Sequence, residues 1–179
     1  MDRINLICLG VQDMEKSLAF YKGLGFQTFE QKPNPPIVFF NTQGSKLELF
    51  PLEKLAQDIN EENPPTITNK GFSGITLAIN LESEAAVDDV MALAASLGAN
   101  IAKAPEKVFW GGYSGYFQDL DGYYWEVAYG PNWQFDEHGM LVIEPEAWLK
   151  LLGDRKEAKK TSGWDEGVSV ACFYLCLGW

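Results

Sequence analysis

The chain has 179 residues, and its content of 46% apolar and 13% aromatic residues is that of a globular protein. Lys and Arg number 14 against 25 Asp and Glu, which gives a formal net charge of −11 at pH 7. This charge repels nucleic-acid phosphates and anionic lipid surfaces, so neither is an expected partner. No stretch approaches the roughly 20 consecutive apolar residues that cross a bilayer.

The cysteines and the first residues indicate a reducing, cytoplasmic environment. The sequence after Met1 leads straight into an apolar alternating stretch, without the basic region and long apolar run of a secretion signal. Cys8, Cys172 and Cys176 are an odd number of cysteines, at spacings that suggest neither a disulfide framework nor a four-ligand zinc site. We expect Cys172 and Cys176 to be buried as small apolar residues.

The first third of the chain has the pattern of a strand, a helix and three further strands. The apolar run 4–9 predicts a strand, and apolar residues spaced three and four apart predict a helix over 13–22. Asp13 is the expected N-cap, and glycines at 23 and 25 end the helix, because glycine accepts the left-handed conformation. The three further strands are expected over residues 26–31, 37–41 and 46–50.

A composition shift separates this unit from a second one with the same order of elements. Residues 52–68 contain two acidic clusters and Pro64-Pro65, which is typical of a linker, with one short helix over 52–59. The second unit begins with a strand over 75–80 and a helix over 83–97. Its remaining strands are expected over residues 99–104, 109–118 and 123–128.

The ends of the two units match in detail, which indicates an internal duplication. Residues 44–49 and 122–127 each contain a turn glycine followed by an apolar residue, a glutamate and a second apolar residue. A four-stranded unit with one helix leaves one sheet face uncovered, so two units should close with their concave faces inward. We therefore predict an α+β fold in which paired βαβββ modules form a cup-shaped, partly open β-barrel with flanking helices.

These patterns predict one main domain over residues 1–131, followed by a C-terminal extension over 132–179. The domain divides into module one at residues 3–51, a linker at 52–71 and module two at 72–131. Within the extension we expect a hairpin over 135–143, a helix over 145–152, a charged segment at 154–163 and an apolar segment at 168–179. The apolar segment is a candidate buried strand or interface.

The matched glutamates Glu48 and Glu126 are the main candidates for chemistry. Each has apolar neighbours on both sides in a predicted last strand, so it faces the opposite side of the sheet from them. One interpretation is that both face water on a half-wet sheet. If they point into the cup instead, two carboxylates approach one centre, where they bind a cation or share a proton.

Two longer runs resemble the vicinal oxygen chelate superfamily, which includes glyoxalase I, extradiol dioxygenases and the bleomycin and fosfomycin resistance proteins. The runs are VQDMEKSLAFYKGLGF at residues 11–26 and YFQDLDGYYWEV at residues 116–127, and the resemblance extends over about residues 3–131. In the metal-dependent members, the resemblance implies, each first strand and each last strand supplies one ligand, commonly a histidine early and a glutamate late.

Carried over to this sequence, only the late ligand positions match, at Glu48 and Glu126. The early positions fall at Leu6, or at Asn5 if the register slips by one residue, and at Gly74. Leucine and glycine side chains give a metal no donor, so tight binding of zinc, nickel or iron is not expected. We expect no cofactor, and leave open a magnesium or calcium ion held weakly by the two glutamates.

An aromatic-rich stretch at residues 108–117 falls, by the resemblance, in the strand that lines the cup. Trp110 and Tyr113 are the main candidates to contact a planar or apolar ligand, with Phe109, Tyr116 and Asn5 as further ligand-binding candidates. The alternative for each ring is ordinary core packing. The single histidine, His138, lies outside the matching runs and is expected in a surface turn, so no catalytic triad can be assembled.

Three functions are compatible with these residues and with the resemblance. The first is a small-molecule binder similar to the bleomycin-resistance branch, which needs an aromatic cleft and no metal. The second is a lyase or isomerase resembling glyoxalase I, with Glu126 as general base; it needs a group that stabilises an enediolate, and no Lys or Arg stands near the motif. The third is an interaction module that uses the apolar C-terminal segment. The resemblance also implies a homodimer.

Overall fold

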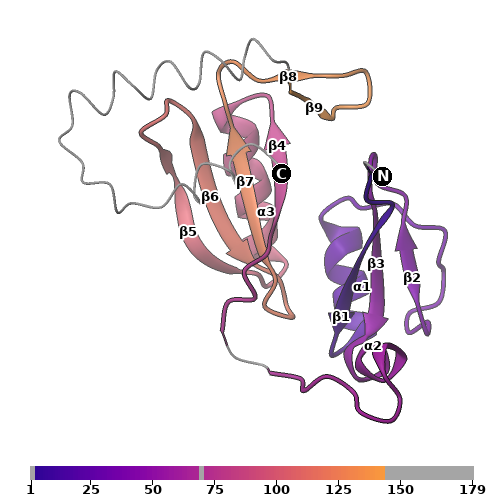
Figure 1. The fold of residues 1–179 in the computed structure, drawn as a ribbon. Coiled ribbons are helices and arrows are strands. Elements are labelled where there is room, and N and C mark those ends of the chain that lie inside the picture. The colour runs from indigo at the N-terminus through magenta and orange to yellow at the C-terminus, as the bar shows by residue number, and fades with distance from the viewer. Residues whose placement is uncertain (1–2, 69–70, 144–179) are drawn as a thin grey trace.

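The structure is a computed structural model that describes residues 3–68 and 71–143 (Figure 1). The predicted helix at 145–152, the charged segment at 154–163 and the apolar segment at 168–179 lie outside the described residues. Cys172 and Cys176 lie outside them as well.

Module one consists of β1 (Leu6–Val11), α1 (Met14–Gly23), β2 (Val38–Phe40) and β3 (Lys46–Pro51). β3 lies in the middle of its sheet, parallel to β1 and antiparallel to β2. The Asp13 side chain caps α1 by accepting a hydrogen bond of 3.1 Å from the backbone N–H of Lys16, as predicted. Gly25, with a φ of 100°, ends the helical path, also as predicted.

The strand predicted over residues 26–31 does not form, so this expectation is wrong. Side chains in this segment bond to nearby backbone groups: Thr28 accepts from the N–H of Glu30, and Glu30 accepts from the N–H of Lys32. Such local bonds compete with a strand ladder. The three prolines at 33, 35 and 36 then provide no N–H donors. One backbone hydrogen bond, from Asn41 to Gln27, joins the segment to the end of β2.

Module two repeats the order of elements and contains all four strands. It consists of β4 (Thr76–Leu81), α3 (Glu84–Ser96), β5 (Asn100–Lys107), β6 (Tyr113–Gln118) and β7 (Tyr124–Tyr129), with the strand order β4-β7-β6-β5. β6 begins later than predicted because residues 108–112 form a turn, closed by hydrogen bonds from Val108 to Gly112 and from Gly111 to Val108. The predicted linker helix is present as α2 (Leu52–Ile59).

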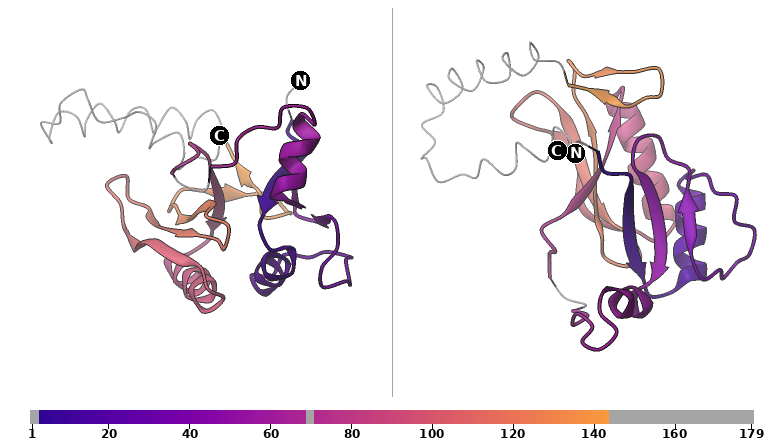
Figure 2. Two further views of the ribbon diagram at one scale, coloured as in Figure 1. Left: turned by 90° about the horizontal axis from the view of Figure 1, so that it is seen from below. Right: turned by 45° about the vertical axis from the view of Figure 1, so that its right-hand side comes forward.

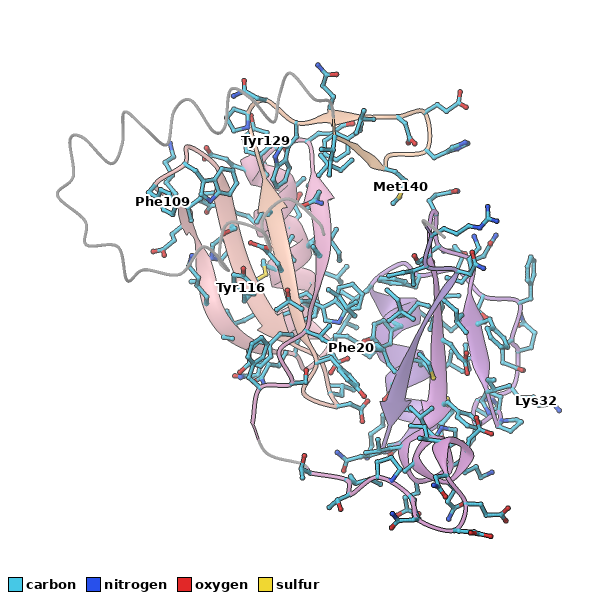
Figure 3. The ribbon with its side chains drawn as sticks, in the orientation of Figure 1. Phe20, Lys32, Phe109, Tyr116, Tyr129 and Met140 are labelled. Atoms are coloured by element: carbon cyan, nitrogen blue, oxygen red, sulfur yellow. The ribbon has the colours of Figure 1, made fainter. Side chains whose placement is uncertain are left out.

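The hairpin predicted after module two is confirmed as β8 (Gln134–Phe135) and β9 (Leu141–Val142). Its turn contains His138, whose side chain is exposed, and Gly139, whose φ of 74° suits glycine. The hairpin lies next to module one, because the Cε atom of Met140 would be only 2.9 Å from a Cβ added at Gly44 (Figure 3).

The layers show how the two modules combine. In the left view of Figure 2, α1 and α3 lie beside each other below the two sheets, and α2 lies on the other side of the first sheet. The three-stranded and four-stranded sheets share no ladder, so the barrel is open. The predicted α+β class with a partly open cup is confirmed, apart from the strand missing from module one.

One hydrophobic core extends through both modules. Phe20 of α1 lies 6.3 Å from Phe117 of β6, and Tyr21 lies 5.9 Å from Trp125 of β7, as measured between ring centroids. Phe26 reaches the same tryptophan at 5.7 Å. Figure 3 shows Phe20 directed from α1 toward module two. The modules are therefore one packed unit and not separate bodies on a linker.

The helices α1, α2 and α3 are all too short or too polar to span a membrane, which holds for the described ranges 3–68 and 71–143.

Candidate functional site

Glu48 and Glu126 occupy equivalent positions in the two modules. On β3, Glu48 lies opposite Cys8 of the parallel strand β1, and on β7, Glu126 lies opposite Ala78 of the parallel strand β4. Both partners are the third residue of their strand. The predicted duplication therefore extends to the register of the sheets.

Both glutamates are directed away from α1 and α3. Their strand neighbours, such as Leu47 and Trp125, belong to the core that packs on these helices, and alternation places the glutamates on the other face. Neither lies on a wet surface, since Glu48 is 8% exposed and Glu126 1% exposed. The structure thus places two buried carboxylates on the sheet faces that are turned away from α1 and α3. On the first sheet this is the face on which α2 packs, since Leu52 and Leu55 of α2 lie over Gly10 (Figure 2). We call these two faces with their glutamates the glutamate site.

Cys8 is a member of the glutamate site that was not predicted from the sequence. Burial raises the pKa of its thiol most, the charge of Glu48 and a hydrogen bond with Glu48 add to the effect, and together they bring this pKa to about 12. At neutral pH the thiol therefore stays protonated beside the carboxylate. The signal was present in the sequence, because alternation along the first strand puts Cys8 on the same face as Leu6, the expected early ligand position.

The residues of the glutamate site do not fit the transition metal that the resemblance implies for some relatives. Beside Glu126 the first strand offers only the methyl group of Ala78, and Gly74 lies before β4 with a φ of 82°. Beside Glu48 stands a thiol whose raised pKa makes the loss of its proton, which metal binding requires, more costly. Among residues 3–68 and 71–143, no three His, Cys, Asp or Glu side chains gather as a metal site.

The aromatic candidates divide between several places. Tyr116 of β6 lies opposite Glu126 in the ladder and so faces the side of the sheet that is turned away from α3 (Figure 3). Tyr113, three residues earlier, faces α3 and donates its hydroxyl to Asp88 at 2.9 Å. It therefore lies on the other side of the sheet from Glu126.

Trp110 and Phe109 lie in the turn between β5 and β6. The Trp110 ring stacks on Trp133 at a centroid distance of 5.8 Å and also covers Gly112, where a Cβ atom would be 1.9 Å from ring carbons. Glycine at this position is what lets the indole lie flat on the backbone. Phe109 is 86% exposed at the tip of the turn.

Asn5 lies just before β1 and is exposed. Its backbone oxygen accepts a hydrogen bond of 2.9 Å from the N–H of Lys46, which extends the pairing of β1 with β3 by one residue. The structure thus brings together Glu48 with Cys8 and Glu126 with Tyr116, and it places Tyr113, Trp110 and Phe109 elsewhere on module two.

These features define an α+β protein of two matched modules, each with a buried glutamate in its last strand. The chain belongs to the Glyoxalase/Bleomycin resistance protein/Dioxygenase superfamily, whose family model matches residues 3–127. Among curated proteins, no significant match to the chain was found.

Solved structures support the same assignment of the fold. A glyoxalase-related enzyme from Fulvimarina pelagi is 27% identical, with a TM-score of 0.70 over 80% of this chain and 99% of that one. A lactoylglutathione lyase from Agrobacterium tumefaciens is 22% identical, with a TM-score of 0.53 over 76% of this chain and 99% of that one. A family enzyme from Burkholderia phytofirmans is 20% identical, with a TM-score of 0.56 over 71% of this chain and 98% of that one.

Proposed function

We propose that the protein binds a small planar or apolar molecule at the glutamate site, with Glu48 and Glu126 as polar anchors and without a resident transition metal. The observation that carries this proposal is the burial of both carboxylates at matched positions whose first-strand partners are Cys8 and Ala78. Ligand sites commonly combine mostly apolar walls with a few well-placed polar groups.

The burial of the glutamates supports a role in binding more than a role in folding. Removing a carboxylate from water costs free energy even where hydrogen bonds offset part of the cost, and an apolar side chain at the same strand position avoids that cost. The sequence nevertheless places a glutamate there in both modules. Tyr116 beside Glu126 adds a ring and a phenol that can orient a ligand.

A fluorescence titration tests the proposal. Thioflavin T, a planar aromatic cation without hydrogen-bond donors, should bind the wild-type protein. Glu126→Gln should weaken its binding about tenfold or more, because the substitution removes the negative charge that attracts the cation in a site shielded from water. Glu137→Gln is the matched control, because this side chain is exposed in the β8–β9 turn. Equal binding by wild type and Glu126→Gln contradicts the proposal.

Metal analysis tests the second half of the proposal. Protein purified without chelator should contain no stoichiometric zinc, nickel or iron by mass spectrometry. One equivalent of such a metal, lost in Glu126→Gln, would support the lyase or isomerase alternative, in which Glu126 is the general base. That alternative also needs a group to stabilise an enediolate. The ladder neighbours of Glu126, Ala78 and Tyr116, supply no cation for it.

A further inference from the structure

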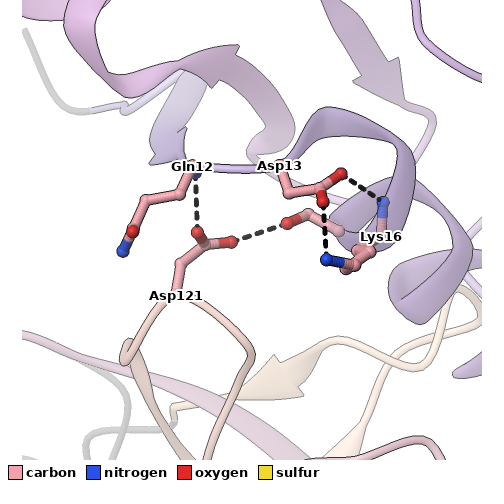
Figure 4. Close-up of polar contacts among 5 residues, drawn as sticks. Gln12, Asp13, Lys16 and Asp121 are labelled. Atoms are coloured by element: carbon pink, nitrogen blue, oxygen red, sulfur yellow. Dashed lines mark hydrogen bonds and ion pairs between the residues drawn. The ribbon is translucent and has the colours of Figure 1, made fainter.

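The turn at residues 119–123, which joins β6 to β7, reaches from module two to module one. The Asp121 carboxylate accepts hydrogen bonds from the backbone N–H of Gln12 at 2.8 Å and from the Ser17 hydroxyl at 2.6 Å (Figure 4). The Tyr123 hydroxyl donates to the backbone oxygen of Gly10 at 3.0 Å. These contacts hold the end of β1 and the start of α1.

Asp119 anchors the same turn from inside the core. It is 5% exposed, and one of its oxygens accepts from the backbone N–H groups of Asp121 and Tyr123 at 3.0 and 2.8 Å. The other oxygen accepts from the hydroxyl of Tyr21 in α1, which in turn accepts from the indole N–H of Trp125 at 3.3 Å. The turn is therefore rigid in itself and bound to module one at several points.

The position of this turn relates the two glutamates. Tyr123 lies three residues before Glu126 on the same chain segment, and Gly10 lies two residues after Cys8, the ladder partner of Glu48. Because the two sheets share no ladder, their relative placement depends on side-chain contacts such as these. The turn thus connects the strand that carries Glu126 to the strand that lies beside Glu48.

We propose that residues 119–123 form a latch that positions Glu126 relative to Glu48, with Asp121 as a positioning residue for ligand binding. This inference rests on the proposed function. The repeated turn in module one has Gln43 where module two has Asp121, when the turn glycines Gly44 and Gly122 are aligned. The acidic latch therefore belongs to module two alone.

Substitutions of Asp121 test the latch. Asp121→Ala removes both acceptor oxygens, so thioflavin T affinity should fall about tenfold. Asp121→Asn should restore most of the affinity, because its amide oxygen can accept from Gln12 and its NH₂ group can donate to the Ser17 hydroxyl. Asp136→Ala is the matched control: Asp136 also accepts from two backbone N–H groups in a turn, those of His138 and Met140, but in the β8–β9 hairpin. It should bind as wild type does.

A double-mutant cycle separates positioning from general destabilisation. In a Glu126→Gln background, Asp121→Ala should have little further effect on thioflavin T binding, because the carboxylate that it positions is gone. Equal losses in both backgrounds would overturn the proposal. Should Asp121→Ala fail to fold, Ser17→Ala removes one of the two bonds and takes its place in the same cycle.

A ligand-independent measurement distinguishes failure of the latch from failure of the proposed function. Amide hydrogen exchange at Gln12 should become faster in Asp121→Ala and stay slow in Asp121→Asn. If thioflavin T does not bind the wild type but Gln12 exchange behaves in this way, the proposed function fails and the structural latch stands. Unchanged exchange at Gln12 in Asp121→Ala overturns the latch itself.

Discussion

Cys8 illustrates how its surroundings set the chemistry of a single side chain. The thiol lies beside the buried Glu48, and burial together with this carboxylate raises its pKa from 9.0 to about 12. In the unfolded chain the thiol ionises near the lower pKa, so the folded state keeps the thiol protonated up to a higher pH. Its contribution to stability is therefore complete below pH 9 and is lost as the pH rises toward 12.

We predict that Glu48→Gln speeds the alkylation of Cys8. Removing the charge of Glu48 lowers the thiol pKa, while burial, the largest cause, keeps it above the usual value. The rate of reaction with iodoacetamide at pH 9 should rise severalfold, as followed by mass spectrometry of the peptide that contains Cys8. Peptide mapping separates this residue from Cys172 and Cys176. Glu137→Gln should leave the rate unchanged, and an unchanged rate in Glu48→Gln would show that the charge does not act on the thiol.

At the residue scale, the two glutamates could be predicted from the sequence, but only part of their surroundings could. The repeated glycine and glutamate spacing marks Glu48 and Glu126 without any knowledge of packing. Whether Tyr113 or Tyr116 faces the glutamate depends on where β6 begins, and the turn at residues 108–112 shifts that start. The roles of Asp119 and Asp121 depend on how the two modules dock, because their hydrogen-bond partners are about a hundred residues away in the sequence.

The helices show how far local signals determine elements. α1 and α3 both begin after a polar cap, Asp13 as predicted and Ser83, and each side chain accepts from the backbone N–H three residues on. Residues 26–31, which were predicted as a strand, do not pair with another strand. Instead, side chains of this segment accept hydrogen bonds from nearby backbone N–H groups. A helix forms its backbone hydrogen bonds within one segment, whereas a strand needs a partner strand, so strands are harder to predict from the sequence.

At the scale of the element, we predict that Asp13→Ala destabilises the protein by about 1 kcal/mol through the loss of the α1 cap. The ion pair of Asp13 with Lys16 is exposed and should contribute little. Asp13→Asn should therefore retain most of the stability, because asparagine is also a good cap. Urea unfolding followed by circular dichroism measures both variants. A loss as large in Asp13→Asn as in Asp13→Ala would assign the effect to charge.

The whole molecule depends on a core shared between its modules. Phe20 is 2% exposed and touches Phe117 across the boundary, so its side chain is buried only when both modules are in place. This docking could not be predicted in detail from the sequence. Duplication indicates that two concave units face each other, but the rotation that joins them depends on contacts such as the latch.

We predict that Phe20→Ala destabilises both modules together, by about 3–5 kcal/mol, as expected for a large aromatic side chain removed from a core. Unfolding followed by tryptophan fluorescence and by circular dichroism should shift to lower urea as one coincident transition. Phe29→Ala is the control, since its ring is 91% exposed. Two separate transitions in Phe20→Ala would show that the modules fold independently.

Unlike the interface between the modules, part of the linker that connects them is fully exposed. Residues 61–68 are exposed throughout, whereas Tyr21, Phe117 and Trp125 interlock at a distance from them. A single proteolytic nick in this stretch would remove a covalent bond without removing any buried surface. The two fragments should then stay associated and sediment as one particle. This non-covalent heterodimer should be held together by the buried aromatic rings and by the latch at residues 119–123.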